Sequence, residues 1–105
     1  MLVEFRIIPV GIGEELKELV AKMLAIVEKS ELDYQLTAMG TLLEGEWEEI
    51  MFVVKKCHDE IKKLSERVVT EIIIDDRKDM KGRLKGKVLE VEYVLGKGLR
   101  TGGLT

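Results

Sequence analysis

Residues 34–51, YQLTAMGTLLEGEWEEIM, decide the fold of this chain. Two short apolar runs, 34–36 and 41–44, flank the turn-forming segment 37–40, and this pattern predicts a β-hairpin. Gly45 ends the second strand, and the following residues, to about position 65, repeat apolar side chains at helical spacing. The centre of the chain is therefore expected to fold as strand, turn, strand and helix.

The segments on either side of this centre add further strands and one more helix. Period-two alternation predicts strands, and apolar residues at three- and four-residue spacing predict a helix. Pro9 is expected to end the first strand because proline lacks a backbone N–H. The expected outer elements are a strand at 2–8, a helix from about 14 to 29, a β-branched strand at 67–77 (RVVTEIIIDDR), a charged loop at 78–86 and a last strand at 87–95.

This order predicts an α+β fold, the ferredoxin-like β-α-β-β-α-β two-layer sandwich, with an extra C-terminal strand. Residues 1–95 are expected to form one domain, followed by a Gly-rich tail at 96–105. Two helices would cover one sheet face and leave the other open. That open face is expected to mix apolar residues such as Ile8 with charged ones, which favours a homo-oligomer. The charged residues expected there are Glu4, Arg6, Glu71, Glu90 and Glu92.

The composition is that of a globular domain. Of the 105 residues, 46% are hydrophobic and 35% are charged, and the formal net charge is −3. The acidic balance disfavours nucleic acid as a partner, and no apolar stretch is long enough for a membrane span. The N-terminus lacks the basic start of a signal peptide, so we expect a cytoplasmic protein. Many Glu and Lys with no Asn and one Gln indicate a heat-adapted source.

The inventory of reactive residues excludes several kinds of site. One Cys permits no intrachain disulfide and no CxxC site, and one His excludes multi-histidine metal sites and disfavours a catalytic triad. Cys57 and His58 are neighbours, but on a helix they point about 100° apart. We therefore expect Cys57 to pack in the core, and His58 to be buried or at an interface with a hydrogen-bond partner.

Two further segments have weak functional patterns. PVGIG at 9–13 precedes a helix but lacks the third glycine of a dinucleotide-binding fingerprint, so a flexible loop is expected. Asp75, Asp76 and Asp79 lack the spacing of a calcium loop, and a solvated strand end is expected there. Arg77 could equally pair with one of these aspartates.

The hairpin itself carries a hydroxyl at Thr41 and a carboxylate at Glu44. Strand alternation places Thr41 and Leu43 on one face and Leu42 and Glu44 on the other. By pattern alone, the segment is a hairpin whose Glu44 helps to cap the following helix.

The chain nevertheless resembles the small YkoF-like thiamine-binding family. The resemblance spans roughly residues 2–94 and rests on EFRIIPVG, Tyr34, MGTLLEGEWEEIM, IIIDDR and a closing strand at Lys87–Val88. It implies ferredoxin-like domains that form homodimers and homotetramers and bind thiamine or its hydroxymethylpyrimidine moiety, with no reaction and no cofactor. The chain departs from the family at Ala38, where a proline is common, and at Gly40, where some relatives have a polar side chain.

The resemblance implies that the ligand-binding residues lie in the hairpin: Tyr34, Thr37, Met39, Gly40, Thr41 and Glu44. Glu44 would accept a hydrogen bond from the pyrimidine amino group, and Thr41 would donate one to a ring nitrogen. An oligomeric scaffold or regulatory module with a different small ligand, or none, is the alternative. An enzyme is disfavoured, because an acylphosphatase of this fold uses an Asn and the chain has none.

Overall fold

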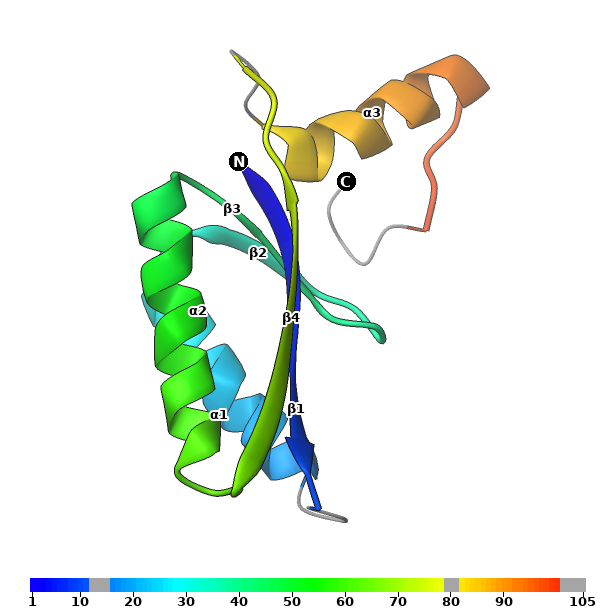
Figure 1. Cartoon of the computed structure of the whole chain (residues 1–105). Helices are drawn as coiled ribbons and strands as arrows, with labels where there is room; N and C mark the ends of the chain where they lie inside the picture. Colours follow the sequence, from blue (N-terminus) through cyan, green and yellow to red (C-terminus); the bar gives the residue numbers. More distant parts are fainter. Residues whose placement is uncertain (12–15, 79–81, 101–105) are drawn as a thin grey trace.

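The computed structural model describes residues 1–11, 16–78 and 82–100. Its strands form one antiparallel sheet in the order β2-β3-β1-β4. This order confirms the predicted α+β, ferredoxin-like fold. The elements, shown in Figure 1, are β1 Leu2–Val10, α1 Leu16–Lys29, β2 Asp33–Leu36, β3 Thr41–Glu44, α2 Trp47–Lys62, β4 Arg67–Asp75 and α3 Arg83–Leu95.

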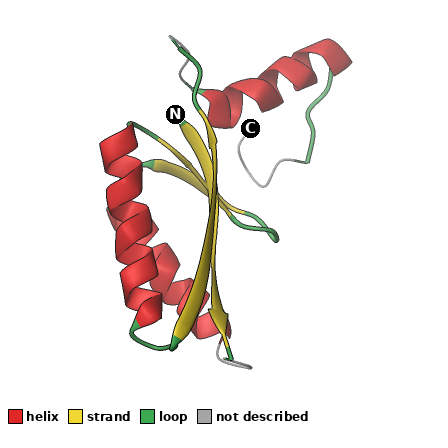
Figure 2. Cartoon of the chain, viewed as in Figure 1, coloured by secondary structure: helices red, strands yellow, loops and turns green. Residues whose placement is uncertain are grey.

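The domain has two layers. Helices α1 and α2 lie side by side on one face of the sheet, as Figure 2 shows. Among the described residues no helix covers the middle of the opposite face, and α3 lies at one end of the sheet. The core fills the space between the sheet and the two helices. Its buried members are Val3, Phe5 and Leu43 from the sheet, Met23 and Val27 from α1, and Ile50, Val53, Val54 and Cys57 from α2.

Strand register fixes which side chains face the core. Val3 pairs with Leu43 and Ile74, so these three side chains share the helix-covered face. The neighbouring Glu4, which pairs with Leu42 and Ile73, faces the other way. The predicted position of Glu4 on the open face is thus confirmed.

Pro9 does not end the first strand, contrary to the prediction. β1 continues to Val10, and Pro9 pairs with Val68 of β4. Beyond Phe5, β1 has no β3 residue beside it, so at Pro9 the sheet is only two strands wide. Proline is tolerated there because it lies at a sheet edge, where a backbone N–H can go without a ladder partner.

The predicted C-terminal strand at 87–95 is wrong, because this segment is the second part of helix α3. The same correction removes Glu90 and Glu92 from the open sheet face. The residues alternate, but Leu84, Val88, Val91 and Leu95 also recur at i, i+4, i+7 and i+11, which is helical spacing. Gly82 (φ 70°) and Gly96 (φ 74°) bound the helix in left-handed conformations that suit glycine.

The structure also shows which residue caps α2. Glu46, not Glu44, is the N-cap of α2, and its backbone N–H donates to Glu49 Oε1 at 3.3 Å. The predicted role of Glu44 as a cap of this helix is therefore wrong. On the exposed face of α2, Lys55 Nζ and Asp59 Oδ2, four residues apart in the sequence, form an ion pair at 2.6 Å. The expected first turn of α1, at residues 14 and 15, lies outside the described residues.

Candidate ligand-binding site

The hairpin turn is organised by the Thr37 side chain. Its Oγ1 donates to the Gly40 carbonyl at 2.9 Å and accepts from the backbone N–H groups of Met39 and Gly40, both at 3.1 Å. A backbone bond from Thr37 N to Gly40 O, 2.8 Å long, closes the turn. Thr37 therefore shapes the hairpin, as threonine does in such turns, and Met39 stands exposed at its tip.

Gly40 lets the hairpin pass close to β1. A Cβ atom at this position would lie 3.1 Å from the Phe5 carbonyl oxygen and 3.5 Å from the Glu4 side chain. A side chain here would push against backbone, so glycine serves packing at this position. Gly40 therefore allows the hairpin backbone to lie close to β1, and it supplies no side chain that could contact a ligand.

Glu44 lies at the other end of β3, on the open face, where it holds the start of α3. Its Oε2 accepts from the backbone N–H of Arg83 at 2.7 Å, and its Oε1 accepts from Leu84 N–H at 3.4 Å. The N-cap residue of α3, Gly82, has no side chain to do this. A carboxylate from β3 thus satisfies helix amides that would otherwise be unpaired, and its charge suits the positive end of the helix.

A small cavity of about 220 Å³ opens beside Glu44. Three acidic residues, Asp33, Glu44 and Glu46, line it. The Met1 ammonium group, also in the wall, donates to the Gly45 carbonyl oxygen at 2.9 Å. Asp33 reaches this place because it pairs directly with Glu44 across the hairpin. The cavity is an acidic environment suited to a cation or to an amino group that donates hydrogen bonds.

Thr41 and Tyr34 lie on the opposite, helix-covered side of the hairpin. Thr41 is 1% exposed, and its Oγ1 has no hydrogen-bond partner among the described residues. Tyr34, on the edge strand β2, shares this face and stays 38% exposed. The structure therefore brings Tyr34 and Thr41 to one side of the hairpin and Glu44 to the other.

The six predicted residues fall into three places: Thr37, Met39 and Gly40 at the turn, Tyr34 and Thr41 on the helix side, and Glu44 on the open side. One flat ring cannot touch both Thr41 and Glu44 of the same protomer, because the sheet separates them. Prediction from the pattern missed Asp33, although a tight turn between two four-residue strands sets the register that places it opposite Glu44. The pattern also missed Gly82, the N-cap of α3, which lines the cavity because the start of α3 lies against Glu44.

The other reactive residues serve the fold. Cys57 is fully buried, as predicted, and burial raises the pKa of its thiol to about 12, so the thiolate is scarce at neutral pH. His58 Nδ1 lies 2.6 Å from Thr70 Oγ1 of β4, which supplies the expected hydrogen-bond partner. Within the described residues no cluster of His, Cys, Asp or Glu has the arrangement of a metal site, and Asp79 lies outside them.

A second and larger cavity, of about 600 Å³, lies between α1 and α2. Its wall includes Ile26, Phe52 and Lys56, and the Lys56 ammonium group sits 5.3 Å from the centre of the Phe52 ring. None of the predicted binding residues lines it.

Comparison with known proteins identifies the family. Residues 3–92 match the family described as "Thiamine-binding protein". The chain belongs to this family. Among curated relatives of this thiamine-binding family member, the UPF0045 protein MJ1052 of Methanocaldococcus jannaschii is 34% identical over 88 residues, covering 84% of this chain and 88% of that protein. The UPF0045 protein YqgV of Bacillus subtilis is 35% identical over 96 residues, covering 86% of this chain and 92% of that protein.

Solved structures share the fold of this thiamine-binding family member. The crystal structure of MJ1052 superposes with a TM-score of 0.79 at 33% identity, covering 86% of this chain and 93% of that one. A Thermotoga maritima protein, TM0486, named as a candidate thiamine biosynthesis/salvage protein, superposes with a TM-score of 0.73 at 24% identity, covering 86% and 96%. In the part of this chain that the structure describes, no helix is long and apolar enough to cross a membrane.

Proposed function

We propose that this protein binds thiamine or its hydroxymethylpyrimidine moiety without catalysing a reaction. The observation that carries the proposal is the carboxylate-lined cavity at Glu44, in a chain that belongs to a thiamine-binding family. An aminopyrimidine presents an exocyclic amine that donates hydrogen bonds, and a carboxylate accepts them. The thiazolium ring of thiamine is cationic, so an acidic wall attracts it as well.

The size of the cavity favours the smaller ligand. At about 220 Å³ it lies below the ~300–1,000 Å³ typical of sites that enclose drug-sized ligands. One heterocycle fits this space better than two linked rings. We therefore expect the pyrimidine moiety to occupy the cavity and the thiazolium of thiamine to extend along the acidic open face.

Within this proposal, Glu44 is the direct ligand contact and Asp33, not among the predicted residues, is a second carboxylate of the wall. Thr37 and Gly40 set the shape of the hairpin, and Met39 is available at its tip. Tyr34 and Thr41 lie on the helix side, away from this cavity. The protein is further proposed to act in the cytoplasm. We also propose that it forms a homodimer or homotetramer, because the open sheet face and α3 expose large apolar side chains.

Calorimetry with thiamine and with hydroxymethylpyrimidine tests the proposal on wild type, Glu44→Gln, Asp33→Asn and Thr41→Val. Glu44→Gln should weaken both ligands at least tenfold, because an amide cannot replace a carboxylate as a charged acceptor. Asp33→Asn leaves the contact between Glu44 and α3 in place and should weaken cationic thiamine more than the neutral pyrimidine. Thr41→Val should bind like wild type.

Two results would overturn parts of this account. Loss of binding in Thr41→Val alone would move the site to the helix side of the hairpin. No heat with either ligand from micromolar to millimolar concentrations would remove the binding function itself. That outcome would favour the second candidate, an oligomeric scaffold or regulatory module, which the exposed apolar surface of α3 supports.

A further inference from the structure

A groove runs between α1 and α2 on the outer surface of the helix layer. The cavity of about 600 Å³ described above occupies the part of this α1–α2 groove where the end of α1, residues 26–32, lies beside the first half of α2, residues 48–56. A second hollow, of about 490 Å³, continues the groove and shares Ile26 and Lys56 with the first. The larger hollow lies within the ~300–1,000 Å³ range of sites that hold small ligands.

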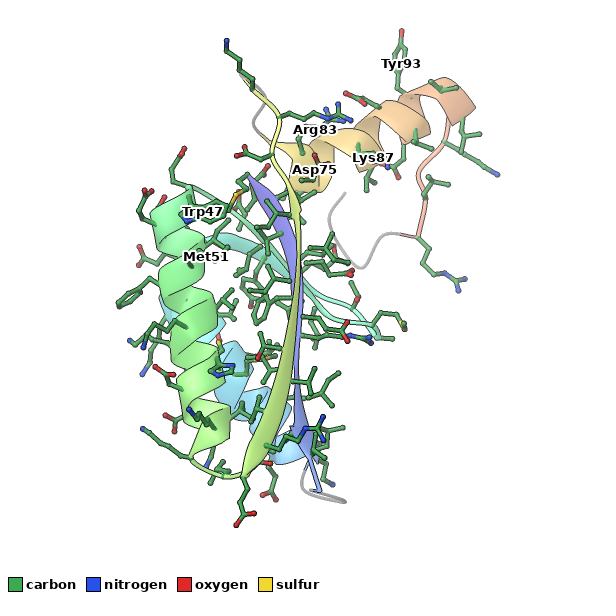
Figure 3. The ribbon with its side chains drawn as sticks, in the orientation of Figure 1. Trp47, Met51, Asp75, Arg83, Lys87 and Tyr93 are labelled. Carbon is green, nitrogen blue, oxygen red and sulfur yellow. The ribbon has the colours of Figure 1, made fainter. Side chains whose placement is uncertain are left out.

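Phe52 presents an aromatic ring to this cavity that the fold does not bury. Its neighbour Met51 points toward the sheet in Figure 3 and packs against the core. Phe52 lies about 100° further round the helix, on the outer surface, and its side chain is 63% exposed. An exposed phenylalanine in the wall of a ligand-sized cavity offers a face on which another flat ring can stack.

The floor of the cavity is apolar and is held by the core. Val53 is 4% exposed and belongs to the core cluster, and Ile26 and Leu32 pack against that cluster. All three residues line the cavity. Their core contacts keep these side chains from collapsing into the hollow, so the cavity is formed before any ligand arrives.

Two ammonium groups border the aromatic surface. Lys29 comes from the last turn of α1 and Lys56 from α2, and both line the cavity. The Lys56 ammonium group lies 5.3 Å from the centre of the Phe52 ring, a cation–π distance. Within residues 1–11, 16–78 and 82–100, neither lysine forms an ion pair. Both cations are therefore available to an anion bound beside Phe52.

The carboxylates of the same wall are largely compensated. Glu48 and Glu49 lie in the first turn of α2, where the positive end of the helix dipole offsets negative charge. Glu49 Oε1 also accepts the backbone N–H of Glu46 at 3.3 Å as part of the capping box. Glu48 is the carboxylate of this wall that opposes an anion most directly.

The adjoining hollow shows the same balance of charge. Its two carboxylates are paired, Asp59 with Lys55 at 2.6 Å and Glu60 with Lys63 at 3.1 Å. Lys22 also lines this hollow and has no ion pair in the part of the chain that the structure describes. The groove therefore keeps its lysines available and most of its carboxylates engaged, although the whole chain carries a formal charge of −3.

We propose that the α1–α2 groove binds an aromatic carboxylate, a flat ring system that carries an anionic group. The ring stacks on Phe52 above the apolar floor, and the carboxylate accepts hydrogen bonds from Lys29 and Lys56. The site shares no lining residue with the Glu44 cavity and does not rest on the proposed binding of thiamine. Since thiamine is cationic, the two sites select ligands of opposite charge.

Three indole probes of different charge test the chemistry of the site. Indole-3-acetate is an anion at neutral pH, indole-3-acetamide is neutral, and tryptamine is a cation. Each is titrated into the full-length 15N-labelled protein. Indole-3-acetate should shift the amide signals of Lys29, Ser30 and Phe52 saturably, and it should bind about fivefold or more tightly than the amide. Tryptamine should bind most weakly, and the reverse order would mean that Glu48 and Glu49 dominate, which would overturn the proposal.

Three variants test the roles of the ring and of the charge. Phe52→Ala should weaken indole-3-acetate about fivefold or more and leave the circular-dichroism spectrum unchanged, because the removed ring is largely exposed. Lys29→Gln should weaken indole-3-acetate about threefold or more without affecting the amide. Lys17→Gln makes the same change of charge at an exposed position of α1 outside the cavity and should bind like wild type.

Three results would contradict this site. Unchanged affinity in Phe52→Ala would remove the ring from the contact, and equal losses in Lys29→Gln and Lys17→Gln would reduce the effect to overall charge. The absence of any saturable shift up to millimolar indole-3-acetate would remove the site itself. Shifts at Gly45 and Arg83 in place of Phe52 would assign the probe to the Glu44 cavity. Binding of hydroxymethylpyrimidine to Phe52→Ala is measured in parallel and should equal wild type, so that failure of either site is recognised separately.

Discussion

The two faces of the sheet differ in how completely the chain covers them. On the helix side, Val3, Phe5 and Leu43 are at most 1% exposed, packed beneath α1 and α2. On the other side, Ile73 and its neighbours remain in contact with solvent. Helices of the same chain cover one face, whereas the other face carries the acidic cavity and apolar side chains that remain exposed. Stability is thus concentrated on one face, and the proposed interactions with thiamine and with a partner are concentrated on the other.

The largest expected effect is a difference in the free energy of unfolding between a substitution on the covered face and one on the open face. Phe5→Ala should lower the free energy of unfolding by about 3–5 kcal/mol, because it removes a buried aromatic ring and leaves a cavity. Ile73→Ala should change it by less than about 0.5 kcal/mol at concentrations where the protein is monomeric, and by more as concentration rises. Chemical denaturation across a concentration series measures both. If Ile73→Ala lowered the free energy of unfolding strongly and equally at all concentrations, the open face would contribute to the stability of the single chain, contrary to this prediction.

The next prediction concerns the link between the open face and α3. Glu44→Ala leaves the amides of Arg83 and Leu84 without their acceptor, so it should destabilise α3 by about 1 kcal/mol, with Glu44→Gln less affected. Hydrogen exchange at these two amides should accelerate while exchange in α2 stays slow. Unchanged exchange in Glu44→Ala would show that another group holds the helix.

Thr41 provides a test of similar size, and of opposite sign, on the covered face. Thr41→Val replaces a buried hydroxyl that has no partner among the described residues, so it should raise the free energy of unfolding by about 1 kcal/mol. Serine at the same position keeps the hydroxyl and serves as the control, with no such gain. If Thr41→Val is destabilising instead, the hydroxyl has a partner in solution, such as a buried water.

The smallest expected effect is a dependence of the stability of α3 on pH. The Arg83 guanidinium, bonded to Glu90 at 2.9 Å, lowers the pKa of that carboxyl. Ionised Glu90 therefore favours the folded helix above the ordinary pKa of glutamate, and this contribution is lost as pH falls through the lowered value. Carbon-detected NMR titration should give a Glu90 midpoint below that of free glutamate, and Arg83→Gln should raise it. Equal midpoints in the two proteins would contradict the pairing.

The hairpin and its neighbours show how much of the fold could be predicted from sequence. The strand Thr41–Glu44 and the turn at 37–40 were predicted at their observed positions, because local alternation and turn chemistry decide them. Residues 87–95 were assigned to a strand because a short run of Val, Leu and Glu fits both a period of two and a helical period. The glycines at positions 82 and 96, which bound the helix in left-handed conformations, are the local signal that favours a helix over a strand.

The candidate site was harder to predict, for a physical reason. Alternation predicts Glu44 on the face opposite Thr41, but its partners are the amides of Arg83 and Leu84, about forty residues away in the chain. No local pattern encodes that contact. Strand alternation places Thr41 and Glu44 on opposite faces, but it does not show that helices cover the Thr41 face, so that one ring cannot reach both residues.

The central claim is that ligand and α3 meet at the Glu44 carboxylate. Titration of 15N-labelled protein with hydroxymethylpyrimidine, followed by two-dimensional NMR, tests it most directly. The amide signals of Gly45, Arg83 and Leu84 should shift and saturate, while those of Met39 and Gly40 at the hairpin turn should barely move. Saturable shifts confined to the turn or to the helix side, or no saturable shift at all in the folded protein, would contradict the claim.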